Sequence, residues 1–152
     1  MRSYKAWTRV LVAAALLAAV AAAILAVAAS AQSGQRLSHP VRPFHLEKNC
    51  DHFFGGIGDY CTISTTNLPA LAGGTIFYVQ AAGETALDSD IVIYAGSGNT
   101  ATGHCFLPFP TGPGHCELFG GTGTLEGLHA SVVVTYISGT NWAWDGTYRF
   151  KG

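Results

Sequence analysis

A glycine-rich turn that leads into a long run of β-branched residues constrains the fold of this chain more than any other feature. The turn is FGGTGTLEG at residues 119–127, and the run is ASVVVTY at residues 130–136. Glycine permits the sharp bends and close backbone approaches by which a sheet curls, whereas Val and Thr favour strands. The pattern therefore predicts a corner of a curled sheet, as in a barrel.

Other strand-like runs, separated by Gly, Pro, Asn and Ser, precede and follow this corner. They cover residues 60–66, 75–82, 90–95, 101–107, 115–119, 126–137 and 141–150. After the apolar N-terminal segment, no stretch shows the 3.6-residue period of an amphipathic helix. Short strands at this spacing predict an all-β sandwich or barrel, and the glycine-hinged corner favours a single antiparallel β-barrel.

The N-terminus has the organisation of a secretory signal peptide. Three basic residues and no acid precede residues 10–29, which are all Val, Leu, Ile or Ala, and Ala29-Ser30-Ala31 supplies a cleavage site. We expect residues 1–31 to be removed and the protein to be secreted. The alternative is an uncleaved anchor, because twenty apolar residues can just cross a bilayer, and membrane contact is expected only through this leader. Residues 32–48 show no period and predict a flexible tether, followed by one domain at 49–152.

Removal of the leader changes the charge balance. The remaining chain has five basic and nine acidic residues, a net charge of −4 before counting histidines. Nucleic-acid surfaces need clustered Lys and Arg, so no nucleic-acid partner is expected. About 121 residues are enough for one hydrophobic core and too few for two domains.

Four cysteines in an exported chain predict two disulfides. Cys50 and Cys61 are separated by 11 positions, as are Cys105 and Cys116, and we favour these two local pairs among the three possible connectivities. A bond between Cys105 and Cys116 across the Pro- and Gly-rich residues 108–114 would set the register of a hairpin. It would place Phe106 opposite His115 and His104 opposite Glu117.

Two carboxylates are candidate catalytic groups. By alternation Glu126 shares a face with Leu128, Val132 and Val134, and burial on that face would raise its pKa and suit it to acid or base catalysis. Glu117 is the second candidate. The alternative for each is a solvated residue or the partner of a nearby cation.

Aromatic side chains in the last strand are candidates to line a ligand pocket. Trp142, Trp144 and Tyr148 share one face with Phe150, and Gly146 interrupts the run as the mark of a β-bulge. Together with Tyr136 these three form the predicted ligand-binding set. The alternative is that most of them fill the core, because small barrels are normally filled by side chains.

Metal sites are not expected. Gly-His-Cys occurs at residues 103–105 and 114–116, which suggests zinc ligands, but the spacing lacks C-x₂-C and an oxidising compartment favours disulfides. Asp88, Asp90 and Asp145 lack the pattern of a calcium loop and are interpreted as solvated turn residues. No cofactor motif is present either, since the GGTG turn lacks the Lys-Ser/Thr and the helix of a phosphate loop.

The segment FGGTGTLEG at residues 119–127 resembles the GGTG segment of plant dirigent proteins and of the allene oxide cyclase barrel. The ending WAWDGTYRF at residues 142–150 resembles that of secreted actinobacterial proteins of the same superfamily. The resemblance implies a calycin-like barrel of about eight strands with a largely apolar cavity, often as a homo-oligomer. It also implies an isomerase- or cyclase-like activity that requires no cofactor.

Two functions follow as expectations. The first is an exported, disulfide-stabilised barrel that binds a small apolar molecule and guides its cyclisation or isomerisation by positioning. The second is a non-enzymatic secreted or envelope module with a packed barrel. A further hypothesis, a metal-dependent hydrolase with cysteine ligands, would require free thiols. An interior cavity would favour the first function, and a packed interior the second.

Overall fold

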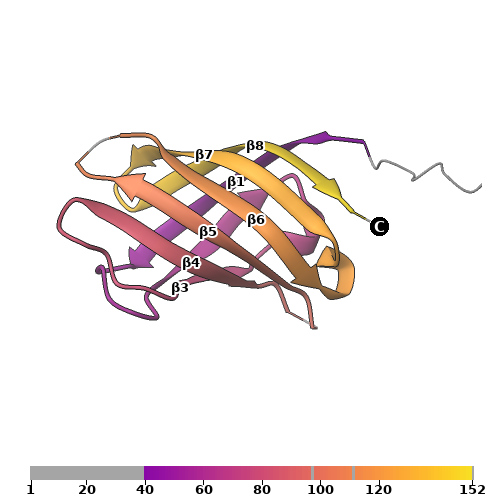
Figure 1. Ribbon diagram of the computed structural model, residues 1–152, viewed down its shortest axis with the longest axis horizontal. Helices are drawn as coiled ribbons and strands as arrows, with labels where there is room; N and C mark the ends of the chain where they lie inside the picture. The colour runs from indigo at the N-terminus through magenta and orange to yellow at the C-terminus, as the bar shows by residue number, and fades with distance from the viewer. Residues whose placement is uncertain (1–39, 97, 111, 152) are drawn as a thin grey trace, which may run out of the picture. The chain divides into compact units, whose positions relative to one another are not determined.

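The described part of the chain folds into one closed antiparallel barrel of eight strands (Figure 1). The computed structural model describes residues 40–151 except residues 97 and 111. Each strand pairs with its neighbours in sequence, and β1 pairs with β8 to close the barrel. The strands are β1 (Arg42–His52), β2 (Tyr60–Thr66), β3 (Thr75–Tyr78), β4 (Ala86–Tyr94), β5 (Thr100–Pro108), β6 (Gly114–Thr122), β7 (Leu128–Ser138) and β8 (Asn141–Phe150). The prediction of a single antiparallel β-barrel is confirmed.

The prediction of a tether over residues 32–48 is wrong from Arg42 onward, because β1 begins there. Phe44, Leu46, Lys48 and Cys50 alternate with solvated residues and point into the barrel. Charged residues and Pro43 conceal this alternation in the sequence, since they are poor strand formers. The domain therefore starts before residue 49, while the predicted leader and residues 32–39 lie outside the described residues.

Two short 3₁₀ turns lie at the same end of the barrel. The first, η1 (Pro69–Leu71), joins β2 to β3, and the second, η2 (Gly123–Leu125), joins β6 to β7. Leu71 and Leu125 are fully buried and extend the apolar core at this end. In Figure 1 the end of β8 is near this end, on the right, and the loop between β5 and β6 is at the opposite end.

Both predicted disulfides are present, Cys50–Cys61 between β1 and β2 and Cys105–Cys116 between β5 and β6. The hairpin register is also as predicted, with Phe106 opposite His115 and His104 opposite Glu117. All four cysteines are bonded and buried, so the interpretation as zinc ligands and the hydrolase that needs free thiols are contradicted. Two disulfides fit an oxidising environment.

Gly146 does not mark a bulge. β8 keeps an unbroken register with β1 and β7 across this position. A side chain here would clash with the carbonyl oxygen of Ser131 on β7, so glycine allows a close approach of the two strands. The inward alternation of Trp142, Trp144 and Tyr148 therefore continues through Gly146.

Removing the disulfide between β5 and β6 should destabilise the barrel without changing its topology. The bond restricts the unfolded chain, so we expect Cys105→Ala with Cys116→Ala to lower the free energy of unfolding by about 2–4 kcal/mol. Urea denaturation followed by tryptophan fluorescence measures this loss. A double variant as stable as the parent would contradict the stabilising role of the bond.

Candidate functional site

An apolar pocket of about 570 Å³ opens at the barrel end opposite the 3₁₀ turns. We call it the mouth pocket. Its walls come from the end of β5 and the following loop, the end of β7, and the start of β8. The lining residues are Leu107, Pro108, Phe109, Pro110, Gly112, Pro113, Val134, Thr135, Tyr136 and Trp142. Its volume is in the range of pockets that hold small organic ligands, and its lining is mainly apolar, as in such pockets.

A smaller cavity of about 70 Å³ lies deeper in the barrel, and we call it the inner cavity. It shares Leu107, Phe109, Val134 and Trp142 with the mouth pocket, so the two hollows are neighbours. The rest of its lining consists of Lys48, Cys50, Phe53, Cys61, Tyr78 and Leu87. The mouth pocket thus leads toward two polar groups, the amine of Lys48 and the hydroxyl of Tyr78.

Lys48 is the one charged residue that is buried in the described part of the chain, with 3% of its surface exposed. Its Nζ donates a hydrogen bond of 2.5 Å to the Tyr78 hydroxyl. Nζ also lies 5.2 Å from the ring centroid of Tyr78 and 4.7 Å from that of Trp144. No carboxylate among the described residues forms an ion pair with it. The aromatic faces are its main electrostatic support.

Burial controls the protonation of this pair. Desolvation lowers the pKa of Lys48 from 10.5 to about 7, because the apolar interior disfavours the ammonium ion. Desolvation also raises the pKa of Tyr78, so its hydroxyl keeps its proton. Near neutral pH the site therefore contains an amine that readily becomes neutral beside a phenol that stays protonated. Such a pair can act as a nucleophile or base together with a proton donor.

The position of Lys48 follows from local strand geometry. Lys48 has the same parity as Phe44, Leu46 and Cys50, so its side chain points inward. A bulge lies beside it, because Glu47 pairs with Thr65 whereas Lys48 pairs with Ile63, which leaves Ser64 unpaired. Bulges are frequent next to functional sites, where they redirect a side chain. On its other side Lys48 pairs with Trp142 of β8.

Trp144 has a buried polar atom without a partner. Its side chain is fully buried, and its indole Nε1 has no hydrogen-bond partner in the described part of the chain. Buried donors are nearly always satisfied, so an unpaired one calls for an explanation such as a water molecule or a ligand. The same indole is one of the two aromatic faces that contact the Lys48 amine.

The predicted ligand-binding aromatics separate into three positions. Trp142 lines both hollows, and Tyr136 lines the mouth pocket and contacts Trp142 edge-on at 5.3 Å between ring centroids. Trp144 is in the core beside Lys48 and lines neither hollow. Tyr148 is buried and packs edge-on against Phe44, away from the mouth pocket. The structure thus brings Trp142 and Tyr136 together at the mouth.

Glu126 does not lie on the inward face of β7. The strand begins at Leu128, after η2 and after Gly127, whose φ of 73° breaks the extended run. The alternation counted from the sequence therefore does not reach Glu126, and its side chain is exposed. It lines neither the mouth pocket nor the inner cavity. A catalytic role for Glu126 stays a prediction, and the exposed position of its side chain does not support that role.

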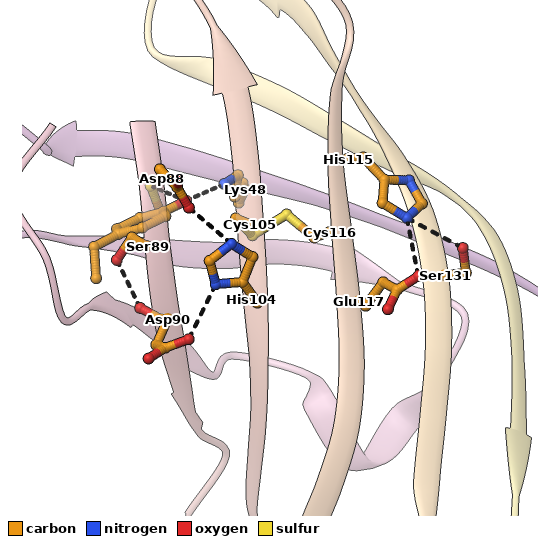
Figure 2. Close-up of a disulfide and its surroundings, with 12 residues drawn as sticks. Lys48, Asp88, Ser89, Asp90, His104, Cys105, His115, Cys116, Glu117 and Ser131 are labelled. Carbon is orange, nitrogen blue, oxygen red and sulfur yellow. Dashed lines mark hydrogen bonds and ion pairs between the residues drawn. A yellow bond between two sulfur atoms is a disulfide. The ribbon is translucent and has the colours of Figure 1, made fainter. Parts of the chain in front are cut away.

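Glu117 lies on the outer surface of β6. It borders a shallow polar hollow of about 270 Å³ outside the barrel, together with His129, Ser131 and Arg149. Its carboxylate lies 3.4 Å from His115 Nε2 (Figure 2). Glu117 is thus separated from the inner cavity by the barrel wall, and its catalytic role also stays a prediction.

The histidine of the first Gly-His-Cys repeat is bound by two carboxylates. His104 Nε2 lies 2.9 Å from Asp88 and Nδ1 lies 3.0 Å from Asp90, so the ring is held between them on the outer surface (Figure 2). The hydrogen bond to Asp90 is the main reason that the pKa of His104 is raised. Asp145 on β8 pairs directly with His45 on β1, and its carboxylate lies 2.7 Å from Nδ1 of that histidine. These three aspartates lie in strands β4 and β8, not in turns, and each lies within hydrogen-bond distance of a histidine ring.

Comparisons of this chain with protein-family models, with curated proteins and with solved structures find no match. Among the described residues, no helix is long and apolar enough to cross a membrane. The geometry of the barrel interior is therefore the basis for the function proposed below.

Sequence reasoning missed Lys48 and Tyr78. Lys48 lies in the predicted tether, and Tyr78 lies in the predicted strand over residues 75–82, where nothing distinguishes it from its neighbours. The available signal was the alternation Phe44, Leu46, Lys48, Cys50, in which a lysine occupies an inward position. A charged residue at the core face of a strand is rare and is often functional.

Burial of Lys48 should make the stability of the barrel depend on pH. Between about pH 7 and pH 10.5 the unfolded state binds more protons than the folded state, so this residue causes stability to rise with pH across that window. Lys48→Met removes the cost of burying the ammonium ion. We expect the free energy of unfolding of Lys48→Met to exceed that of the parent by the largest amount below pH 7, on the order of a few kcal/mol. This difference should shrink toward pH 10.

Urea denaturation at several pH values measures this difference. Lys151→Met, at an exposed position, serves as the control and should leave the pH dependence unchanged. If the curves of Lys48→Met and the parent run parallel over this range, the amine is not desolvated in the folded protein.

Proposed function

We propose that this barrel binds a small apolar molecule through its open end. The observation that carries the proposal is the mouth pocket of about 570 Å³, which adjoins an inner cavity that contains Lys48 and Tyr78. An apolar ligand would displace water from Leu107, Val134 and Trp142, which is favourable in proportion to the apolar area buried. The two polar groups beneath would select for a ligand with one polar end.

The shape of the barrel supports a single ligand that enters from one side. The core is extended at the far end by Leu71 and Leu125 of the 3₁₀ turns. Small eight-stranded barrels have room for about one small ligand at most, since side chains fill the remaining interior. A ligand would therefore occupy the mouth with its apolar part and direct its polar end toward Lys48.

The cellular setting is part of the proposal. The leader at residues 1–31 would direct export, and the two disulfides suit an oxidising compartment. Secretion also agrees with the resemblance to the dirigent and allene oxide cyclase superfamily. Membership of that superfamily is a proposal for this chain, and so is the formation of a homo-oligomer. An anchored form would result if the leader stayed uncleaved.

Guidance of a cyclisation or isomerisation would use confinement together with the Lys48–Tyr78 pair. Holding a reactive molecule in one conformation lowers the entropic barrier to ring closure. Among the described residues on the inner cavity, the acid–base groups are the amine of Lys48 and the phenol of Tyr78, and Glu117 and Glu126 line neither interior hollow. The competing function, a non-enzymatic module with a packed barrel, gains no support from an open mouth pocket of this volume.

Filling the mouth pocket should weaken ligand binding. Val134 lines the pocket and is 3% exposed, whereas its neighbour Val133 points outward and is 44% exposed. We expect the environment-sensitive probe N-phenyl-1-naphthylamine to bind the parent in this pocket. Val134→Phe should reduce that affinity about tenfold or more, because the added ring occupies ligand space.

Val133→Phe is the matched control, with the same chemical change on the outer face of the same strand. It should leave the affinity of the probe unchanged, and circular dichroism should confirm that both variants fold. Absence of binding by the parent, or equal losses in both variants, would instead favour the packed structural module.

A further inference from the structure

We propose that the ligand of this barrel is an apolar aldehyde or ketone, which Lys48 captures as an imine with Tyr78 as the proton donor. This inference rests on the proposed function and goes beyond it, because it names the chemical class of the ligand and the atom that bonds to it. Four features of the site lead to it: the isolation of the amine, the neighbouring hydroxyl, the position of the cavity, and the scarcity of other polar groups.

The first feature is an amine without a counter-ion. Lys48 is buried, and the described residues provide no carboxylate within ion-pair distance. A lysine that is retained for structural reasons inside an apolar core would normally be paired, since an unpaired buried charge is costly. Desolvation instead favours the neutral amine, which is the nucleophilic form.

The second feature is the hydroxyl of Tyr78, 2.5 Å from Nζ. This hydroxyl lies in the same inner cavity, and burial raises its pKa, so it remains a proton donor. Addition of an amine to a carbonyl group needs a proton for the developing oxygen anion. Tyr78 is held by packing, since Phe53 contacts its ring edge-on at 4.9 Å between centroids.

The third feature is the size and position of the inner cavity. Its volume of about 70 Å³ suits a carbonyl group and a few atoms next to it, while the mouth pocket suits the apolar remainder. Leu107, Phe109, Val134 and Trp142 border both hollows, so a ligand that passes between them meets the amine at its end.

The fourth feature is the small number of side chains that can form hydrogen bonds to the polar group of a ligand. The hydrogen-bonding side chains on the inner cavity are Lys48, Tyr78 and the indole of Trp142. A buried carboxylate has about four acceptor positions and needs a protonated lysine, which burial disfavours here. A carbonyl oxygen is satisfied by one or two donors. The site is therefore better matched to an electrophilic carbonyl group than to an anion.

The proposed step conserves atoms and electrons. The Nζ lone pair attacks the carbonyl carbon and forms the C–N bond, while the carbonyl oxygen takes the Tyr78 proton. The tyrosinate recovers a proton from the nitrogen and passes it to the new hydroxyl, which leaves as water as the C=N bond forms. Tyr78 then takes the remaining iminium proton. The products are a neutral imine and one water molecule, and no oxidant or reductant is required.

Reductive trapping tests this proposal on the full chain. The protein is incubated with cinnamaldehyde and sodium cyanoborohydride at neutral pH, and the reduced adduct is mapped by mass spectrometry. The sequence contains three lysines, Lys5, Lys48 and Lys151, and Lys151 is an exposed internal control. We expect modification of Lys48 to be on the order of tenfold faster than that of Lys151, because burial makes the Lys48 amine available in its neutral form.

Two variants distinguish loss of adduct formation from loss of the folded structure. Lys48→Met should abolish the interior adduct, and circular dichroism should show that this variant keeps the fold of the parent. Tyr78→Phe keeps the ring and removes the proton donor, so the adduct at Lys48 should form about 100-fold more slowly. Lys151→Arg should leave the rate at Lys48 unchanged.

The outcomes distinguish this inference from the proposed function. If the naphthylamine probe binds and Val134→Phe weakens it, but Lys48 reacts no faster than Lys151, the imine proposal is overturned and apolar binding stands. If cinnamate binds more tightly than cinnamaldehyde without any adduct, the site recognises an anion and the imine proposal is likewise overturned. If no probe binds, the proposed function itself fails.

Discussion

The antiparallel pairing of β1 with β8 determines both the closure of the fold and the position of its buried amine. Eight residues of β1, from Arg42 to Asn49, pair in unbroken register with β8 and close the barrel. Closure removes the exposed strand edges of an open sheet, which are prone to aggregation. It also encloses the inward side of β1, so that Lys48 lies inside the barrel beside Trp144 and Tyr78. The feature that completes the fold thus also creates the polar centre of the candidate site.

The two ends of the barrel have different structures, and this asymmetry gives the interior a direction. At one end the 3₁₀ turns bury leucine side chains, and at the other the mouth pocket opens among Pro, Phe and Trp residues. The disulfides lie toward the open half, where Cys50 and Cys61 line the inner cavity.

Much of the fold was predictable from local sequence signals. The limits of β2 and β8, the disulfide pairs and the register of the β5–β6 hairpin all match the expectations, because turn residues and cysteine spacing encode them locally. The sequence analysis does not predict β1, because its polar residues conceal the alternation and one of its two pairing partners, β8, is about 100 residues away. Glu126 was misplaced for the opposite reason: a regular alternation in the sequence is interrupted by η2 and by Gly127 in the backbone.

The candidate site was less predictable than the fold. Trp142 and Tyr136 were recognised from the aromatic pattern, and both line the mouth pocket. Lys48 and Tyr78 are 30 positions apart in the sequence and lie on β1 and β3, which do not pair with each other because β2 lies between them. The curvature of the barrel across β2 brings their polar atoms together. Sequence periodicity reports the face of a strand, but it does not report which residues meet across a closed interior.

The most direct test of an occupied barrel interior is an intermolecular nuclear Overhauser measurement on the protein with bound N-phenyl-1-naphthylamine. We predict contacts from the probe to the methyl groups of Leu107 and Val134 and to the indole of Trp142, and none to the outward Val133. Contacts confined to the outer hollow around His129 and Arg149 would contradict it, because they would place the ligand outside the barrel.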